Sequence, residues 1–129
     1  MKYLVDSDYV ADYLGAHTHA IQLLSSFAKD DLSISLITYG EFYEGIHFGR
    51  GPRKTTEVFH RFLRSIEILP LTKPIMQQFA RIRGGLRRKG QMIGDFDILI
   101  AATAIQHHLT LVTRTIKDYQ RIPNLKLYQ

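Results

Sequence analysis

Acidic side chains recur at four places along this chain of 129 residues, each just after a short apolar segment or at the start of an expected helix. These acids are Asp6, Glu41, Asp97 and Asp118. In a parallel sheet the carboxyl ends of the strands share one edge, and ligands bind in the crevice outside that edge. Carboxylates gathered there repel one another and take up protons unless a cation offsets their charge. The pattern therefore predicts a divalent cation site.

The types of ligand atom available indicate which cation binds and which reaction it catalyses. Carboxylate oxygens completed by water suit Mg²⁺, with Mn²⁺ as a substitute, and the chain has no cysteine for a thiolate zinc site. Such an ion lowers the pKa of a bound water and stabilises the leaving oxygen of a phosphodiester. The net charge of +5 favours a polyanionic partner. Together these features predict phosphodiester hydrolysis.

Each acid also has a structural explanation when it is taken alone. Asp6 or Asp8 can cap the helix that follows the first strand. Glu41 fits a capping box with Thr38, in which its carboxylate reaches back to the Thr38 amide. Asp118 can be an ordinary solvated charge in a loop. The convergence of four acids on one sheet edge favours a common site over four separate caps.

Asp95 and Asp97 stand at the opening of the apolar segment 98–105. The helix dipole favours negative charge at that position, so a cap explains one of the two aspartates. Two aspartates spaced two residues apart cannot both cap the same helix end, and Asp97 leads directly into the core face of the segment. We therefore expect Asp97 to belong to the site.

Short apolar runs alternate with longer stretches of helical period, which is the pattern of βαβ units and a mostly parallel sheet. The predicted strands are 3–5, 33–36, 66–69, 111–112 and 125–127. Apolar residues share helical faces in 21–28, 58–66 and 75–86, and 98–105 is apolar on nearly every side, as in a buried helix. A basic loop, 48–54, is predicted between two helices. The simplest division is one domain, residues 1–129.

Composition excludes several other classes of protein. Without cysteine, disulfide frameworks and cysteine nucleophiles are ruled out. The N-terminal segment reaches a charge at Asp6 before a signal peptide could form, and no apolar run approaches the roughly 18 residues of a membrane span. Nucleotide-binding glycine motifs and the serine-hydrolase elbow are absent. We expect a soluble, cytoplasmic protein that does not associate with membranes.

Four sequence blocks hold the acids together with their neighbours. They are Val5-Asp6-Ser7-Asp8, Thr38-x-x-Glu41, Gly94-x-x-Asp97-x-x-Ile100-Ala101-Ala102, and Leu111-Val112-Thr113 followed by Lys117-Asp118-Tyr119. In this order the set resembles the PIN domain, and more narrowly the toxin of VapBC-type toxin–antitoxin pairs. The resemblance covers essentially the whole chain, and the ordered set is far more specific than any single block.

The resemblance implies a PIN-like three-layer α/β/α sandwich with a central, mostly parallel five-stranded sheet. It also implies Mg²⁺-dependent endoribonuclease activity, a toxin role, a cognate small DNA-binding antitoxin and a homodimer. Carried over by position, the metal-binding and catalytic acids would be Asp6, Glu41, Asp97 and Asp118, with Asp95 as an auxiliary and Thr113 and Thr115 as supporting polar residues.

Two positions depart from the family pattern. Many relatives have Asn or Thr where this chain has Asp8, and many have Asn at the position of Thr115. A threonine hydroxyl still hydrogen-bonds a ligand carboxylate or a water. We therefore expect these changes to tune the site rather than abolish it.

Two basic segments are candidates for contact with the RNA backbone. Arg87, Arg88 and Lys89 end a predicted helix, and Arg50 and Arg53 lie in the predicted basic loop. The structural alternative for the first segment is that cations stabilise a helix C-terminus. We expect part of the first segment to hold RNA and take the second as a further candidate.

The helix that contains Glu41 has more apolar residues than one core contact requires. Phe42 and Ile46 share one helical face, and Tyr39, Tyr43 and Ile46 share another. Such residues usually form core contacts, but a surplus would provide an antitoxin groove.

Two other functions compete with the nuclease. A receiver-like phosphotransfer domain also gathers acids at strand ends, but it needs an aspartate where the third strand here ends in Leu69-Pro70-Leu71. A non-catalytic PIN-fold module that binds RNA or protein is compatible with the sequence. Cleavage assays with Mg²⁺ and an EDTA control separate that module from the enzyme.

Overall fold

The computed structural model describes residues 1–48 and 52–129, and for 52–55 it describes the backbone alone. The first elements are β1 (Tyr3–Val5), α1 (Ser7–Leu14), α2 (Thr18–Ser26) and the 3-10 turn η1 (Lys29–Asp31). The middle elements are β2 (Leu32–Ser35), α3 (Leu36–Phe48), α4 (Pro52–Leu63) and β3 (Glu67–Leu69). The last elements are α5 (Lys73–Lys89), α6 (Asp95–Gln106), β4 (Thr110–Val112), α7 (Ile116–Tyr119) and β5 (Lys126–Leu127). The predicted strands are confirmed to within one residue at each end.

The five strands form one sheet in the order β3-β2-β1-β4-β5, and every pairing is parallel. In the centre of the sheet Val5 of β1 is in register with Val112 of β4. The residues that follow these two strands, Asp6 and Thr113, therefore emerge side by side. A parallel sheet of this kind is the scaffold that the acids require.

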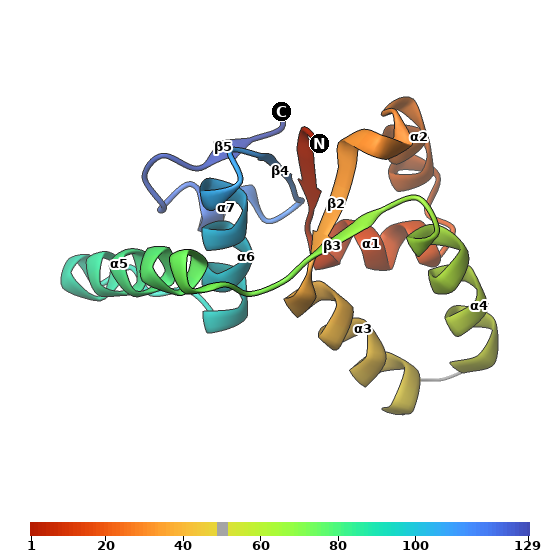
Figure 1. The fold of residues 1–129 in the computed structure, drawn as a ribbon, viewed down its shortest axis with the longest axis horizontal. Helices are drawn as coiled ribbons and strands as arrows, with labels where there is room; N and C mark the ends of the chain where they lie inside the picture. Colours follow the sequence, from red (N-terminus) through yellow and green to blue (C-terminus); the bar gives the residue numbers. More distant parts are fainter. Residues whose placement is uncertain (49–51) are drawn as a thin grey trace.

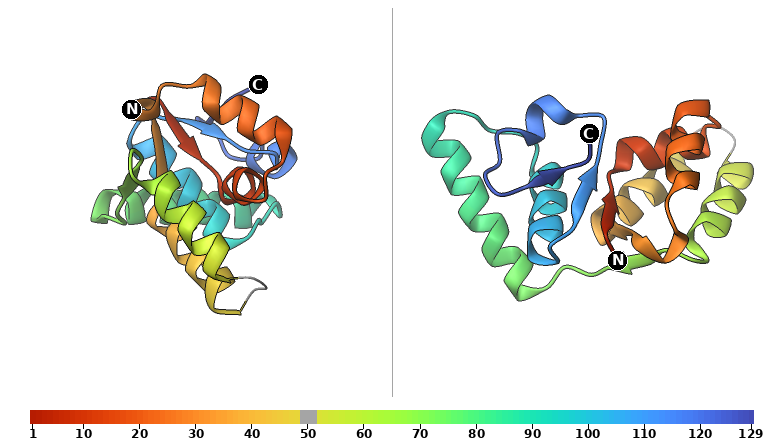
Figure 2. Two further views of the ribbon diagram at one scale, coloured as in Figure 1. Left: turned by 90° about the vertical axis from the view of Figure 1, so that its right-hand side faces the viewer. Right: turned by 90° about the horizontal axis from the view of Figure 1, so that it is seen from above.

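Side chains alternate between the two faces of the central strands. Leu4 and Leu111 point into a core formed with α5, α6 and α7. Their neighbours Val5 and Val112 point into the opposite core, formed with α1, α2 and α4. Figure 1 shows α5 and α6 on the left, α1 to α4 on the right and strands between them, and the right-hand view of Figure 2 agrees. The three-layer α/β/α prediction is confirmed.

The predicted buried helix is α6, in which Ile98, Ile100 and the following four residues are buried. Two other predictions need correction at helix ends. Ala28 and Ile66 lie just beyond α2 and α4, so they do not continue those helical faces. Pro52 begins α4, because its fixed φ suits a first helical turn. Arg53 is therefore in a helix rather than the predicted basic loop, and Arg50 lies outside the described residues.

The apolar surplus on α3 packs against α4. Phe42 stacks on the fully buried Phe59 with ring centroids 4.1 Å apart, and the rings of Tyr39 and Tyr43 lie about the same Phe59. These residues are partly buried and pack against the core of that face of the sheet, while their use as an antitoxin groove stays a prediction. Within the described part of the chain, no helix is long and apolar enough to cross a membrane.

Candidate active site

Asp6 is held at the centre of the sheet edge by both neighbouring strands. Its backbone amide donates to Val112 O at 2.9 Å, which extends the pairing of β1 and β4 by one step. Its carboxylate accepts from the Thr113 hydroxyl at 2.6 Å through Oδ2 and from the Ser7 amide at 2.8 Å through Oδ1. Asp6 is thus also the N-cap of α1. The capping explanation is correct but incomplete, because a cap alone does not require a carboxylate that is only 4% exposed.

Burial raises the pKa of Asp6 to about 7, and the charge of Asp8 contributes to this increase. The hydrogen bonds from Thr113 and Ser7 act in the opposite direction, because they favour the ionised carboxylate. A small additional increase comes from the charge of Asp97. Several carboxylates therefore share this edge of the sheet in a poorly solvated space.

Tyr119 links the two central acids. Its side chain is fully buried, and its hydroxyl lies 3.3 Å from Asp6 Oδ1 and 3.3 Å from Asp97 Oδ1. Burial and the two neighbouring carboxylates raise the pKa of Tyr119, so it keeps its proton and acts as a donor. A hydroxyl has only one proton, which the two carboxylates must share. Tyr119 therefore connects the acid that follows strand β1 with the acid in the first turn of helix α6.

Asp97 reaches this point from the first turn of α6. Gly94 occupies the N-cap and supplies no side-chain hydrogen bond. Because Asp97 lies in the first turn, the dipole of α6 favours its negative charge. Asp97 is half-buried, and burial raises its pKa, as do the charges of Asp118 and Asp8. The hydrogen bond from Tyr119 lowers it. Asp97 is therefore coupled to acids on other elements.

Glu41 joins the site through Ser7. The Ser7 hydroxyl donates to Glu41 Oε1 at 2.7 Å, and because it has one proton, Thr38 must donate across the 2.9 Å contact with Ser7 Oγ. Helix α3 begins at Leu36, so Thr38 lies inside the helix and is not its cap. The capping-box alternative is therefore excluded. The Ser35 hydroxyl instead accepts from the Ile37 amide at 3.0 Å.

Asp8 stands beside Asp6 in the first turn of α1. Its Oδ2 accepts from the Arg114 amide and from the Thr115 hydroxyl, each at 3.0 Å, and lies 3.2 Å from the Thr113 hydroxyl. Its Oδ1 is buried and has no hydrogen-bond partner among the described residues. A buried carboxylate oxygen without a partner is costly, so this atom points to a ligand outside the polypeptide.

The other two predicted acids occupy more open positions. Asp118 lies in α7, with Oδ1 3.9 Å from Nη2 of Arg121, and it is near enough to Asp97 to raise the pKa of that residue. Asp95 is 56% exposed and accepts from Nε of Arg83 at 2.8 Å. Asp118 therefore belongs electrostatically to the cluster, whereas the contacts of Asp95 are with the cation of a neighbouring helix.

The structure gathers Asp6, Glu41, Asp97 and Asp118 around the edge that the sequence predicted, and the supporting roles of Thr113 and Thr115 have concrete contacts. Sequence reasoning gave no role to two polar partners, Ser7 and Tyr119, and it named Asp8 only as a possible cap or a departure that tunes the site. All three belong to the sequence blocks that contain the acids. The signal that would have revealed Asp8 is its position two residues after Asp6, together with polar residues after the neighbouring strand.

These donors fit a hard divalent cation. Among the described residues, no group of three His, Cys, Asp or Glu side chains is arranged to hold a metal ion by itself. Mg²⁺ does not need such a cage, because it keeps several waters and is usually bound through one or two carboxylates. Asp6 and Asp97 supply two carboxylates on either side of Tyr119, and the unpartnered Asp8 Oδ1 adds an acceptor for a ligand or water. The oxygen-only set therefore fits.

Three predicted basic residues lie at the end of α5. Arg87, Arg88 and Lys89 are exposed and form its last turn, where cations stabilise the helix terminus. Gly90 then ends the helix with φ of 65° and turns the chain toward Asp95. The structural alternative for this segment is thus correct for the helix, and it does not conflict with a contact to RNA.

Comparisons with known proteins agree with this fold and site. The family model described as PIN domain matches residues 3–123. Ribonuclease VapC2 of Rickettsia felis is 31% identical over 129 residues, covering 98% of this chain and 96% of the relative. The tRNA(fMet)-specific endonuclease VapC of Salmonella typhimurium is 29% identical over 127 residues, with the same coverage of both chains.

A solved structure leads to the same family. The crystal structure of VapBC2 from Rickettsia felis bound to a promoter DNA fragment superimposes with a TM-score of 0.91 and 30% identity. It covers 99% of this chain and 98% of that chain. A parallel sheet with Asp6 at the carboxyl end of β1, beside Asp97 of α6 and Asp118 of α7, defines a metal-dependent nuclease fold of this kind. The chain belongs to the PIN-domain family and, within it, to the VapC ribonucleases.

Proposed function

We propose that this protein is a Mg²⁺-dependent endoribonuclease that acts as the toxin of a toxin–antitoxin pair, with Asp6, Glu41, Asp97 and Asp118 as its catalytic acids. Mn²⁺ is expected to substitute for Mg²⁺, because both ions accept carboxylate and water ligands. RNA is the substrate class, so we place the activity in the cytoplasm. We also propose that the protein acts as a homodimer, which sedimentation velocity will test.

The observation that carries the proposal is the link from Asp6 through Tyr119 to Asp97. Two carboxylates from different elements lie within 3.3 Å of one buried hydroxyl, and burial raises the pKa of both. A purely structural pair of this kind destabilises the fold, since like charges are brought together out of water. A bound cation would offset the repulsion between the two carboxylates, and the cluster would then serve as a metal site.

Each side chain has a distinct part in this proposal. Asp6 and Asp97 would hold the ion, and Glu41 and Asp118 would be the further acids of the same site. Thr113, Ser7 and Tyr119 orient the carboxylates by donating hydrogen bonds to them. When bound, the divalent ion supplies Lewis-acid activation of a water and of the scissile phosphate. By resemblance to the family, the products carry a 5′-phosphate and a 3′-hydroxyl.

The decisive experiment compares two aspartate variants on a mixed RNA substrate. Asp97→Asn is expected to lower Mg²⁺-dependent cleavage by about a hundredfold or more, because it removes a charged group from the reacting centre. Asp30→Asn, on the exposed turn η1, is the matched control and is expected to cleave normally. Circular dichroism checks that both variants fold, and EDTA checks the need for metal. Metal-independent RNA binding without products in the unmodified protein would instead support the non-catalytic module.

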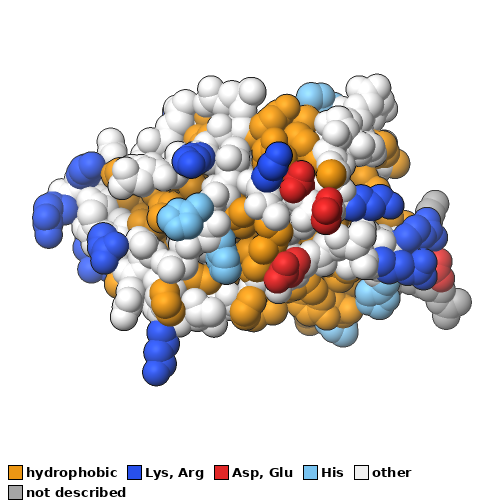
Figure 3. Space-filling model, turned by 45° about the horizontal axis from the view of Figure 1, so that its top comes forward, with side chains coloured by type: hydrophobic (Ala, Val, Ile, Leu, Met, Phe, Trp, Pro, Cys, Tyr) orange, Lys and Arg blue, Asp and Glu red, His pale blue; other side chains and the backbone are white. Residues whose placement is uncertain are grey.

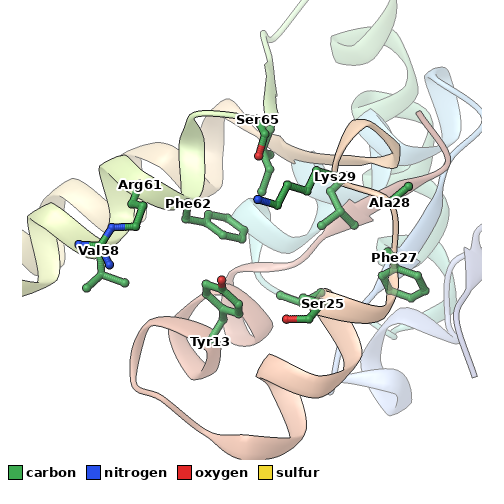
Figure 4. A pocket seen from close by; sticks show the side chains of 12 residues that line it. Tyr13, Ser25, Phe27, Ala28, Lys29, Val58, Arg61, Phe62 and Ser65 are labelled. Carbon is green, nitrogen blue, oxygen red and sulfur yellow. The ribbon is translucent and has the colours of Figure 1, made fainter.

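A pocket of about 510 Å³ between α1, α2 and α4 is suited to the antitoxin. Figure 4 shows Tyr13 of α1, Ser25 of α2, Phe62 of α4 and Lys29 of η1 around one opening. Its lining is mostly apolar, with the cations Lys29 and Arg61 among it, which matches a helix that has apolar and acidic side chains. The solved VapBC2 relative was crystallised as a pair, which supports a partner of this kind.

The neighbouring reading frame is the first place to look for that partner. Co-expression of its product with a variant carrying Lys29→Glu and Arg61→Glu is expected to give less complex than co-expression with the unmodified toxin. A variant carrying Lys2→Glu and Arg64→Glu makes the same change of charge outside the pocket and serves as the control. Equal recovery of complex with both variants would place the antitoxin elsewhere.

A further inference from the structure

A groove runs along α5 on the side that faces the segment after α7. One pocket of about 170 Å³ lies between α5 and residues 121–124, and another of about 440 Å³ lies toward the end of α6 and the start of β5. The two pockets share Gln78, Ile105 and Asn124, so they are parts of one depression. We call it the α5 groove.

The lining of the α5 groove is basic. Its cationic side chains are Arg81, Lys89, Arg121 and Lys126, with His108 at the far end. Among the described residues that line the two pockets, none is Asp or Glu. In Figure 3, Lys and Arg side chains lie at both ends of the molecule, and those on the left, where α5 lies, have no Asp or Glu among them on this face. The groove lining therefore carries a net positive charge, which attracts an anionic chain.

Polar and apolar groups are interleaved with these cations. Gln78, Gln106 and Asn124 present amides that both donate and accept hydrogen bonds. Ile82, Leu86 and Ile105 form an apolar floor. Phosphates, base edges and the faces of sugars and bases are the groups that such a lining recognises in a nucleic acid.

One end of the groove abuts the acid cluster. Arg121 lines the groove and also lies 3.9 Å from Asp118 Oδ1, while its Nη1 donates to Met92 O at 3.3 Å. Lys89 is the last residue of α5, directly before the turn that leads to Asp97. A strand that occupies the groove therefore enters or leaves the proposed catalytic centre.

We propose that the α5 groove holds a single-stranded segment of the RNA substrate beside the scissile bond. This assignment rests on the proposed function. The cations contact phosphates, and the amides and apolar floor contact bases and ribose. The proposal assigns RNA contact to only one of the three basic residues that end α5. Lys89 lines the groove, whereas Arg87 and Arg88 do not.

The test measures RNA binding separately from cleavage. The background is Asp97→Asn in EDTA, and the probe is a fluorescein-labelled oligouridylate followed by anisotropy over a range of salt concentrations. A groove variant carrying Arg81→Ser, Lys89→Ser and Lys126→Ser is expected to bind about tenfold or more weakly and to lower the salt slope by about two, since each phosphate contact to a single strand contributes about 0.7.

A matched variant separates the groove from general charge. Lys2→Ser, Arg64→Ser and Lys73→Ser remove the same charge from exposed positions outside both pockets, so binding and slope are expected to stay near those of the parent. Equal losses in the two triple variants would overturn the groove. The same comparison is made with a labelled polyglutamate of matched length. If the groove variant loses affinity for polyglutamate as much as for oligouridylate, the RNA assignment is overturned, because the surface would then suit acidic peptides.

Cleavage assays in the otherwise unmodified protein keep the two proposals apart. The groove variant is expected to raise KM for RNA with little change in kcat, because its three residues lie outside the acid cluster. Persistent cleavage by Asp97→Asn would refute the catalytic assignment whatever the groove does. A groove variant with unchanged KM and unchanged salt slope would refute the RNA path while the catalytic assignment stands.

Discussion

Thr113 donates a hydrogen bond of 2.6 Å to Asp6, although the two residues are 107 positions apart in the sequence. The bond follows from strand register, because Val5 and Val112 are paired and each of the two residues comes next in its strand. The hydrogen bond lowers the pKa of Asp6 against the effect of burial. Thr113 therefore favours the ionised form of the most buried acid of the site, against the larger effect of burial.

Replacing Thr113 by Val keeps the side-chain volume and removes the hydroxyl. Loss of the donor is expected to raise the pKa of Asp6 and to weaken Mg²⁺ binding by about tenfold, the usual effect of losing a partner of a metal ligand. The measurement is the Mg²⁺ concentration that gives half-maximal RNA cleavage at neutral pH. Thr110→Val, at the start of the same strand, is the control. An unchanged Mg²⁺ requirement would contradict the role given to Thr113.

The stability of the metal-free protein should fall as the pH rises from about 4 to about 7. The ordinary pKa of an aspartate is 3.8, whereas the pKa of Asp6 in the folded protein is about 7, so the folded state binds this proton more tightly. In that window the folded state carries more protons than the unfolded state, and linkage makes the free energy of unfolding decrease with pH. The full effect of this shift is up to about 4 kcal/mol.

Urea denaturation in EDTA across this pH window measures the effect. Asp6→Asn is the informative variant, because Asn caps a helix nearly as well as Asp and does not titrate. Its unfolding midpoint is expected to lose most of the dependence on pH in that window. Added Mg²⁺ should restore stability to the unmodified protein above about pH 7, where Asp6 is ionised. A midpoint that rises through this window in the metal-free protein would be inconsistent with a buried Asp6 whose pKa is raised.

Much of the fold could be predicted from periodicity, and the positions of Asp6 and Asp97 followed from it. Asp6 follows the end of β1 and Asp97 lies in the first turn of α6, and the sheet determines the direction of both elements. The contacts of Asp8 and Tyr119 could not be predicted in this way. Asp8 looks like a helix cap, and Tyr119 looks like one more buried aromatic, until the fold places its hydroxyl between two carboxylates.

The basic residues show a second limit of the sequence. Arg87, Arg88 and Lys89 are adjacent in the chain, but successive residues on a helix point about 100° apart. Only the packing of α5 against the C-terminal segment decides that Lys89 lines the groove. Arg121 carried no signal in the sequence because the loop that positions it has no period.

Asp8→Asn tests the unpartnered carboxylate oxygen. Asn keeps an acceptor for the Arg114 amide and the Thr115 hydroxyl, but it removes a charge that raises the pKa of both Asp6 and Asp97. The metal-free variant is expected to be more stable above about pH 7, while its Mg²⁺ requirement increases. Urea denaturation in EDTA and Mg²⁺ titration of cleavage measure the two effects. If neither changes, Asp8 is not part of the cation site.

Tyr119→Phe removes the hydroxyl that joins Asp6 to Asp97 and leaves the ring in the core. The hydrogen bond from Tyr119 lowers the pKa of Asp97, so its loss is expected to raise that pKa and to move the acid limb of the pH–rate profile to higher pH. Cleavage at neutral pH should fall about tenfold, as for other partners of metal ligands. Tyr128→Phe is the control, because the ring of Tyr128 packs on Tyr3 and Phe27 and makes no contact with either acid in the described structure. A drop in rate without a shift of the pH profile would mean that Tyr119 acts through core packing alone, and the link between the two acids would then lose its catalytic meaning.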